Sequence, residues 1–155
     1  MKKLFLNLFL FPALAFAANP PIRPDASLTP GVVNPDATVD VICVPNYTAG
    51  VDAKGNKVRN VPESLKKKAF AAYNIDPTTD KFEIDHLINL ELGGANDLKN
   101  LWPQSYTTQP WNAHKKDALE NKLHKLVCQK KLDLAVAQQE ISKDWIAAYN
   151  KYVSQ

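Results

Sequence analysis

The sequence contains little cysteine, little glycine and little net charge, and each shortage excludes an interpretation. Two cysteines without a Cys-x-x-Cys pair argue against a structural zinc site. Five glycines and no internal repeat exclude a low-complexity chain outside one proline-rich segment. Without Lys2 and Lys3, the 19 basic residues become 17 against 16 acidic ones, so any electrostatic argument for a polyanionic partner has to be local.

The first 17 residues have the three parts of a secretory signal peptide. Lys2 and Lys3 form a positive start, residues 4–13 form an apolar core, and Ala15-Phe16-Ala17 is a small-residue cleavage site. The alternative is a membrane anchor, but the apolar run is shorter than the ~20 residues that cross a bilayer. We therefore predict an exported protein, periplasmic or secreted, with no membrane span once residues 1–17 are removed.

The remaining roughly 138 residues suffice for one domain with its own core. Residues 18–37 hold five prolines, which predicts an extended or mobile arm. Residues 38–155 would form the single domain. In an exported chain, Cys43 and Cys128 favour one disulfide. It would close a loop of about 85 residues, and the chain-entropy model gives this closure a stabilisation of ~4.5 kcal/mol, less any native strain. Two buried free thiols are the alternative.

Alternation of Val39, Val41 and Cys43 predicts a short strand over residues 38–44. Pro62 suits the first turn of a helix that Asp76-Pro77 ends. Strands are predicted from Phe82 towards Leu90 and over residues 100–102, with a turn at Gly93-Gly94 between them. Two helices follow, over residues 111–131 and after a cap at Asp133. This order predicts an α+β domain.

Residues 82–116 read FEIDHLINLELGGANDLKNLWPQSYTTQPWNAHKK. Asp85-His86, Gly93-Gly94, Asn100 and Asn112-x-x-Lys115 follow one another in an order that resembles the HNH endonucleases. The resemblance implies a ββα-metal core, in which two antiparallel strands and one helix surround a divalent cation. The flanking segments resemble those of small exported bacterial proteins that carry this domain; the shared segments are CVPNYT, NLWP and residues 116–128. This resemblance also implies a disulfide between Cys43 and Cys128.

The resemblance also implies site residues, and elementary chemistry is consistent with them. Hydrolysis of a phosphodiester needs a base and a cation that stabilises charge on the phosphate. His86 would be the base, because a neutral imidazole titrates near working pH. Asp85 and Asn112 would supply oxygen ligands to Mg²⁺, with Mn²⁺ or another divalent ion as alternatives. Asn100 would hold the loop and orient the His86 ring.

The third motif position stays open between Asn112 and His114, which face about 200° apart on a helix. Asn112 matches N-x-x-K and is favoured. With Asn112 at the helix start, Glu120 lies ~12 Å and His124 ~18 Å along the axis, which argues against both as ligands. His124 would instead pack or cap beside Cys128. Adjacent strand residues point to opposite faces, so Asp85 and His86 share a site only if the strand bends.

Local charge favours a polyanion. Residues 111–131 contain six lysines against Asp117 and Glu120, and Lys115 or Lys116 would contact the scissile phosphate. Arg59 would extend this basic surface. No motif for reading base edges is present, so binding is expected to depend on the backbone and on salt.

Three functions follow. The first is an exported, monomeric, metal-dependent endonuclease that hydrolyses DNA, and RNA as a second substrate, with little sequence specificity. The second is a catalytically inactive module on the same fold that binds nucleic acid or an envelope partner. The third is a disulfide-stabilised structural protein of the cell envelope in which Asp85-His86 is incidental.

Overall fold

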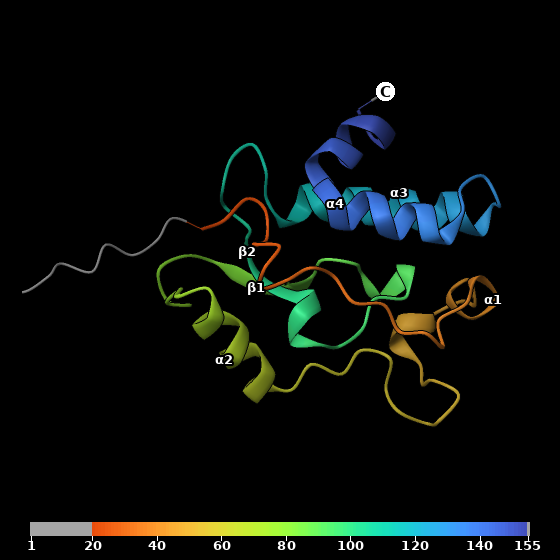
Figure 1. Ribbon diagram of the computed structural model, residues 1–155, viewed down its shortest axis with the longest axis horizontal. Coiled ribbons are helices and arrows are strands. Elements are labelled where there is room, and N and C mark those ends of the chain that lie inside the picture. Colours follow the sequence, from red (N-terminus) through yellow and green to blue (C-terminus); the bar gives the residue numbers. More distant parts are fainter. Residues whose placement is uncertain (1–19, 155) are drawn as a thin grey trace, which may run out of the picture.

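The centre of the molecule is an antiparallel pair of short strands, β1 (Phe82–His86) and β2 (Leu101–Ser105). Asp85 lies opposite Trp102, and His86 lies opposite Leu101. The computed structural model describes residues 20–154, so the predicted signal peptide and the start of the arm lie outside the described residues. Within that range, four α-helices and this sheet form the mixed α+β fold that the sequence predicts (Figure 1).

Helix α2 (Glu63–Ala72) begins directly after Pro62, as predicted. It lies on one side of the strand pair, and the paired helices α3 (Ala113–Cys128) and α4 (Leu134–Tyr152) lie on the other (Figure 1). Phe70 of α2 meets Phe82 of β1 edge-on, with ring centroids 5.8 Å apart. The strands are therefore covered on both sides.

The main core lies between α3 and α4 and follows the predicted apolar stripes. Both helices contribute side chains that are at most 1% exposed, and burial of each larger one contributes about 2 kcal/mol. These are Leu119, Leu123, Val127, Ala137, Ile141 and Trp145. Ile88 and Leu92, from the connection between the strands, complete the cluster. The connection is thereby held against α3.

Helix α4 has a kink that the sequence analysis did not predict. Asp144 has non-helical dihedral angles, φ −161° and ψ 96°. Its carboxylate accepts the backbone N–H groups of Ile146 and Ala147 and also pairs with Arg23 at 2.9 Å. Asp144 therefore acts as the N-cap of a second helical segment.

The predicted strand over residues 38–44 is wrong: α1 (Val39–Ile42) is one helical turn. Ile42 is its buried side chain, at 1% exposure, whereas Val41 is 38% exposed. Alternation over so few residues does not distinguish a strand from a single helical turn. Cys43 follows α1 directly and forms the predicted disulfide with Cys128 at the end of α3.

The described part of the arm contains bends and turns rather than one extended run, and it is packed against the connection between the strands. Gly31 N–H donates to the carbonyl of Lys99, and Ala95 N–H donates to that of Val32. Thr29 is 1% exposed. Among the described residues, no helix is both long and apolar enough to cross a membrane.

Candidate functional site

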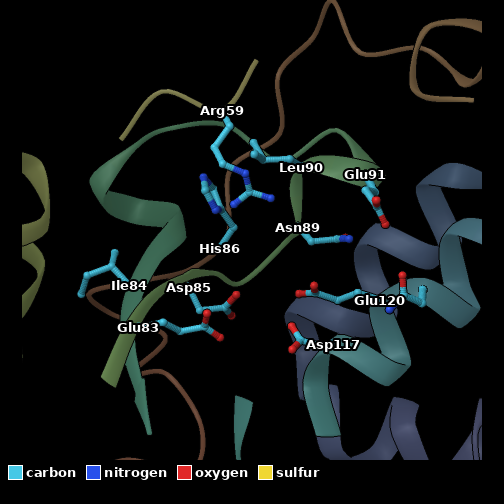
Figure 2. Close-up of a pocket in the computed structure, with 11 residues that line it drawn as sticks. Arg59, Glu83, Ile84, Asp85, His86, Asn89, Leu90, Glu91, Asp117 and Glu120 are labelled. Carbon is cyan, nitrogen blue, oxygen red and sulfur yellow. The ribbon is translucent and has the colours of Figure 1, made fainter. Parts of the chain in front are cut away.

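A polar hollow of about 310 Å³ lies where β1 ends (Figure 2). Its walls come from the end of β1, from the connection that follows it, from α3 and from the loop before α2. The polar side chains that line it are Arg59, Glu83, Asp85, His86, Asn89, Glu91, Asp117, Glu120 and Asn121. Asp85 and His86 thus share one site, as the sequence analysis required.

Asp85 and His86 can line the same hollow because β1 ends at His86. His86 is the last residue of β1, and the N–H of Leu87 already donates to the carbonyl of Asn100. Asn100 is completely buried, and its amide bonds both the N–H and the carbonyl of Ile88 as well as the carbonyl of Ala95. Asn100 therefore holds the loop after β1 in place, which is half of the role predicted for it.

The other half, orienting the imidazole, is done by Asn96, which the sequence analysis missed. Nε2 of His86 lies 3.0 Å from Oδ1 of Asn96, and Nδ2 of Asn96 donates to the carbonyl of Val58 at 2.8 Å. Because that carbonyl can only accept, the amide oxygen must face the ring. Nε2 of a neutral His86 therefore carries the proton, and Nδ1 carries the lone pair.

Burial keeps that ring neutral. His86 is 5% exposed, and its burial lowers its pKa below the ordinary value, although the charge of Asp85 and the bond to Asn96 act in the opposite direction. A buried imidazole resists protonation because the charged form loses its hydration. His86 is therefore available as a proton acceptor at neutral pH.

Gly94 allows the loop to come this close to the strand end. A Cβ atom there would lie 1.7 Å from the carbonyl oxygen of Ile88 and 2.8 Å from the amide nitrogen of Asn100. No side chain fits at this position, so the Gly93-Gly94 pair does more than make a turn. It permits the contact through which Asn100 shapes the site.

Lys116 is buried beneath the hollow rather than exposed to substrate. It is 1% exposed, and its Nζ lies 2.7 Å from both the carbonyl of His86 and Oδ2 of Asp85, with Glu120 as a third partner. Burial disfavours the ammonium, but the two carboxylates outweigh it and raise the pKa of Lys116. The predicted phosphate contact by Lys116 is wrong, because a buried and fully engaged ammonium cannot reach a nucleic acid.

Two further carboxylates enter the hollow from α3. Asp117 and Glu120 are three residues apart and lie on one face of the helix. Burial raises the pKa of Glu120 to about 8, against the pull of Lys116, and burial together with Asp85 raises the pKa of Asp117. Glu120 lines the hollow despite its distance along α3 from Asn112, because the hollow faces later turns of that helix.

The hollow contains the type of oxygen donor that hard divalent cations take, although its carboxylates do not lie close enough together, among the described residues, to form a ready metal-binding group. Carboxylate and amide oxygens are the ligands that Mg²⁺ and Mn²⁺ take, and Asp85, Asp117 and Glu120 supply the carboxylates. Asn89 is 6% exposed, and its Oδ1 has no hydrogen-bond partner among the described residues. A buried amide oxygen in this state is expected to bind a cation or a water molecule.

The remaining predicted residues of the motif do not line the hollow. Asn112 caps α3, where its side chain accepts the N–H of Lys115 at 3.2 Å. His114 is exposed and lies against Tyr106, with ring centroids 5.1 Å apart. Lys115 extends towards α4, with its Nζ 3.4 Å from the hydroxyl of Tyr149. The structure therefore does not bring Asn112, His114 or Lys115 together with Asp85 and His86.

Arg59, by contrast, reaches the hollow from the loop before α2. Figure 2 shows its guanidinium beside His86, across from the carboxylates of α3. Arg59 therefore lines the hollow, and its predicted contact with nucleic acid stays a prediction. One signal in the sequence pointed to α3 as well: Asp117 and Glu120 interrupt an otherwise basic helix surface at a spacing that puts both on one face.

Searches among protein-family models, curated proteins and solved structures found no match to this chain.

Proposed function

We propose that the protein is an exported, divalent-cation-dependent endonuclease that hydrolyses phosphodiester bonds of DNA on an HNH-like core of β1, β2 and α3. RNA is a second substrate to test. The observation that supports this best is a buried, neutral imidazole whose Nδ1 is left as the acceptor, in a hollow with carboxylates on one side and an arginine on the other.

In this proposal His86 removes a proton from the attacking water through Nδ1. Asn96 holds the ring by Nε2 and keeps the required tautomer throughout. Asp85 lies next to the ring and stabilises the imidazolium that results, because an opposite charge nearby favours the protonated form. A positioned base of this kind contributes about 10²–10⁴-fold to a rate.

Asp85, Asp117 and Glu120 would hold the cation, with the amide oxygen of Asn89 as a further ligand. When bound, a divalent cation stabilises charge on the phosphate and on the leaving oxygen. Arg59 would bind phosphate oxygens, since its guanidinium donates two parallel hydrogen bonds to such a group. Lys116 would keep Asp85 in position through their ion pair.

Plasmid DNA and purified protein test the proposal. We expect nicking with Mg²⁺ or Mn²⁺, none with EDTA, and a loss of about 10²-fold or more in His86→Ala. His124→Ala is the control, because His124 lies beside Cys128 and does not line the hollow, whereas His114 pairs with Asp117. Absence of nicking, or equal nicking by wild type and His86→Ala, would reject the endonuclease.

One observation favours a second function, a binding module without catalysis. The ammonium of Lys116 lies between Asp85 and Glu120 and neutralises charge that a cation would otherwise balance. This alternative predicts salt-sensitive binding of DNA that does not change in His86→Ala but weakens in Arg59→Ala. Cleavage that needs both His86 and a divalent metal would exclude it.

A further inference from the structure

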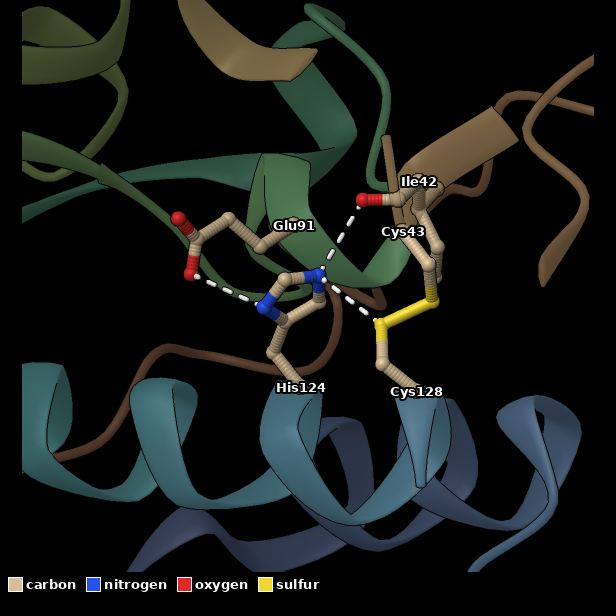
Figure 3. The surroundings of a disulfide bond; sticks show 5 residues. All are labelled: Ile42, Cys43, Glu91, His124 and Cys128. Atoms are coloured by element: carbon tan, nitrogen blue, oxygen red, sulfur yellow. Dashed lines mark hydrogen bonds and ion pairs between the residues drawn. A yellow bond between two sulfur atoms is a disulfide. The ribbon is translucent and has the colours of Figure 1, made fainter. Parts of the chain in front are cut away.

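A second cluster of metal-binding groups lies farther along α3, around the disulfide (Figure 3). His124 precedes Cys128 by one helical turn, and its Nε2 lies 3.3 Å from the Cys128 sulfur. Nδ1 of the same ring lies 3.9 Å from Glu91. The ring therefore lies between the sulfurs of the disulfide and a carboxylate. The sequence predicted only that it would pack or cap beside Cys128.

The distances are close to those of a zinc site. The donor atoms of Cys43, His124 and Cys128 all lie within 4.8 Å of one another. Tetrahedral zinc with Zn–S of about 2.3 Å and Zn–N of about 2.0 Å places nitrogen and sulfur ~3.6 Å apart and two sulfurs ~3.8 Å apart. The imidazole already lies near the required separation from one sulfur. The two bonded sulfurs would have to move apart after reduction, while their Cα atoms are 5.6 Å apart.

The surroundings of His124 match the support that metal-bound histidines receive. With the disulfide formed, Nε2 lies 3.1 Å from the carbonyl of Ile42, which can only accept, so Nε2 carries a proton. When Nε2 binds a metal instead, the proton of a neutral ring is on Nδ1, which faces Glu91. A carboxylate at the second nitrogen orients such rings and strengthens them as ligands.

Access is available for both a reductant and a metal. Cys43, His124 and Cys128 are partly buried, neither sealed in the core nor fully exposed. The ligands come from both ends of the bridged loop, so metal binding would hold α1 against α3 as the disulfide does. The two states exclude each other, because the same sulfurs serve in both.

We propose that reduction of the Cys43–Cys128 disulfide creates a zinc site with two thiolates and Nε2 of His124 as ligands, oriented by Glu91, and with water in the fourth position. A dithiol supplies the two electrons: the S–S bond breaks, each sulfur takes a proton, and the dithiol becomes a disulfide. Binding of Zn²⁺ then displaces both thiol protons. This inference does not depend on the proposed endonuclease activity.

Cobalt is the probe that separates this site from the acidic hollow. The purified chain is reduced with a dithiol, freed of it without oxygen, and titrated with Co²⁺. We expect one Co²⁺ per chain with a thiolate-to-cobalt charge-transfer band, displaced by Zn²⁺. The oxidised chain keeps the hollow but has no thiolate, so it must lack the band. A reduced, folded chain without the band would overturn the proposal.

Variants test the two remaining roles. His124→Ala should weaken cobalt binding by at least about tenfold, and Glu91→Gln should weaken it by about tenfold, within the range for groups that support a ligand. His114→Ala, an exposed histidine on the same helix, should bind like wild type. If His124→Ala binds like wild type, the imidazole is not a ligand and the site is rejected.

If loss of the disulfide unfolds the chain, near-UV circular dichroism provides the test: Zn²⁺ must then restore the native signal in the reduced wild type but not in His124→Ala. A reduced chain that zinc does not refold would also overturn the proposal.

Discussion

The hollow beside β1 and the cluster around the disulfide are both built on α3, yet they use opposite chemistry. The hollow gathers oxygen donors, and the ammonium of Lys116 pairs with two of them, Asp85 and Glu120. The other cluster, between α1 and α3, gathers sulfur and imidazole and is closed by a disulfide. Hard cations select the first kind of site and zinc the second. One helix can therefore present two sites of different selectivity on different turns.

The largest change in the free energy of unfolding should come from removing the ammonium of Lys116, which pairs with two carboxylates of the hollow. Lys116→Met leaves Asp85 and Glu120 buried without their partner, and breaking such a pair costs about 3–5 kcal/mol. Urea denaturation measures the free energy of unfolding. Lys115→Met is the matched control, because Lys115 is exposed and surface changes stay within about 0.5 kcal/mol. Equal stability of the two variants would show that the hollow does not need its ammonium.

Removing the covalent bond from the other region should have a somewhat smaller effect. Replacing both Cys43 and Cys128 by serine should cost about 2–4 kcal/mol, the usual range for a disulfide, which lies below the ~4.5 kcal/mol that the chain-entropy model gives before native strain is subtracted. Metal should then have no effect on stability through this cluster, because no thiolate remains. Urea denaturation with and without Zn²⁺ checks both points. Zinc-dependent stabilisation of this variant would assign the effect of zinc to another site.

A smaller effect should come from removing Asn96, the hydrogen-bond partner of the His86 imidazole. Asn96→Ala removes the group that fixes the tautomer of His86, so we expect nicking to fall about 10–100-fold, part of the contribution of a positioned base. Because Asn96 also bonds the Val58 carbonyl, unfolding should be measured in parallel. Asn121→Ala is a comparison on the α3 wall of the hollow, away from the ring. A rate unchanged in Asn96→Ala would mean that the ring does not need this partner.

The smallest effect concerns a carboxylate outside both regions. Hydrogen bonds from Ser105 and Thr107 hold the pKa of Asp80 below its ordinary value, whereas the acids of α3 have raised pKa values. A lowered pKa adds stability above the unfolded value and loses it as the pH falls through the folded value. Asp80→Asn should therefore be less stable than wild type at neutral pH, and the difference should shrink as the pH falls through the lowered pKa of Asp80. A difference that persists in acid would contradict this.

Much of the fold could be predicted because it depends on local patterns. Apolar spacing located α2, α3 and α4, and the Asp-His and Asn-Leu-Trp segments located the two strands. The disulfide followed from an even cysteine count in a chain whose first 17 residues predict export. The prediction of a strand over residues 38–44 was wrong because seven residues carry too little periodicity to separate a strand from one helical turn.

The sequence by itself located helices α2, α3 and α4 and placed Asp85 and His86 in a strand, and the family resemblance pointed to Asn100 as the residue that holds the loop. Only the tertiary structure decided which turns of α3 face them. Helical periodicity sets the angles between side chains on one helix but not how far that helix slides along its neighbours. That displacement put Asp117 and Glu120 in the hollow, left Asn112 and His114 outside it, buried Lys116, and brought Cys43 to His124 and Cys128.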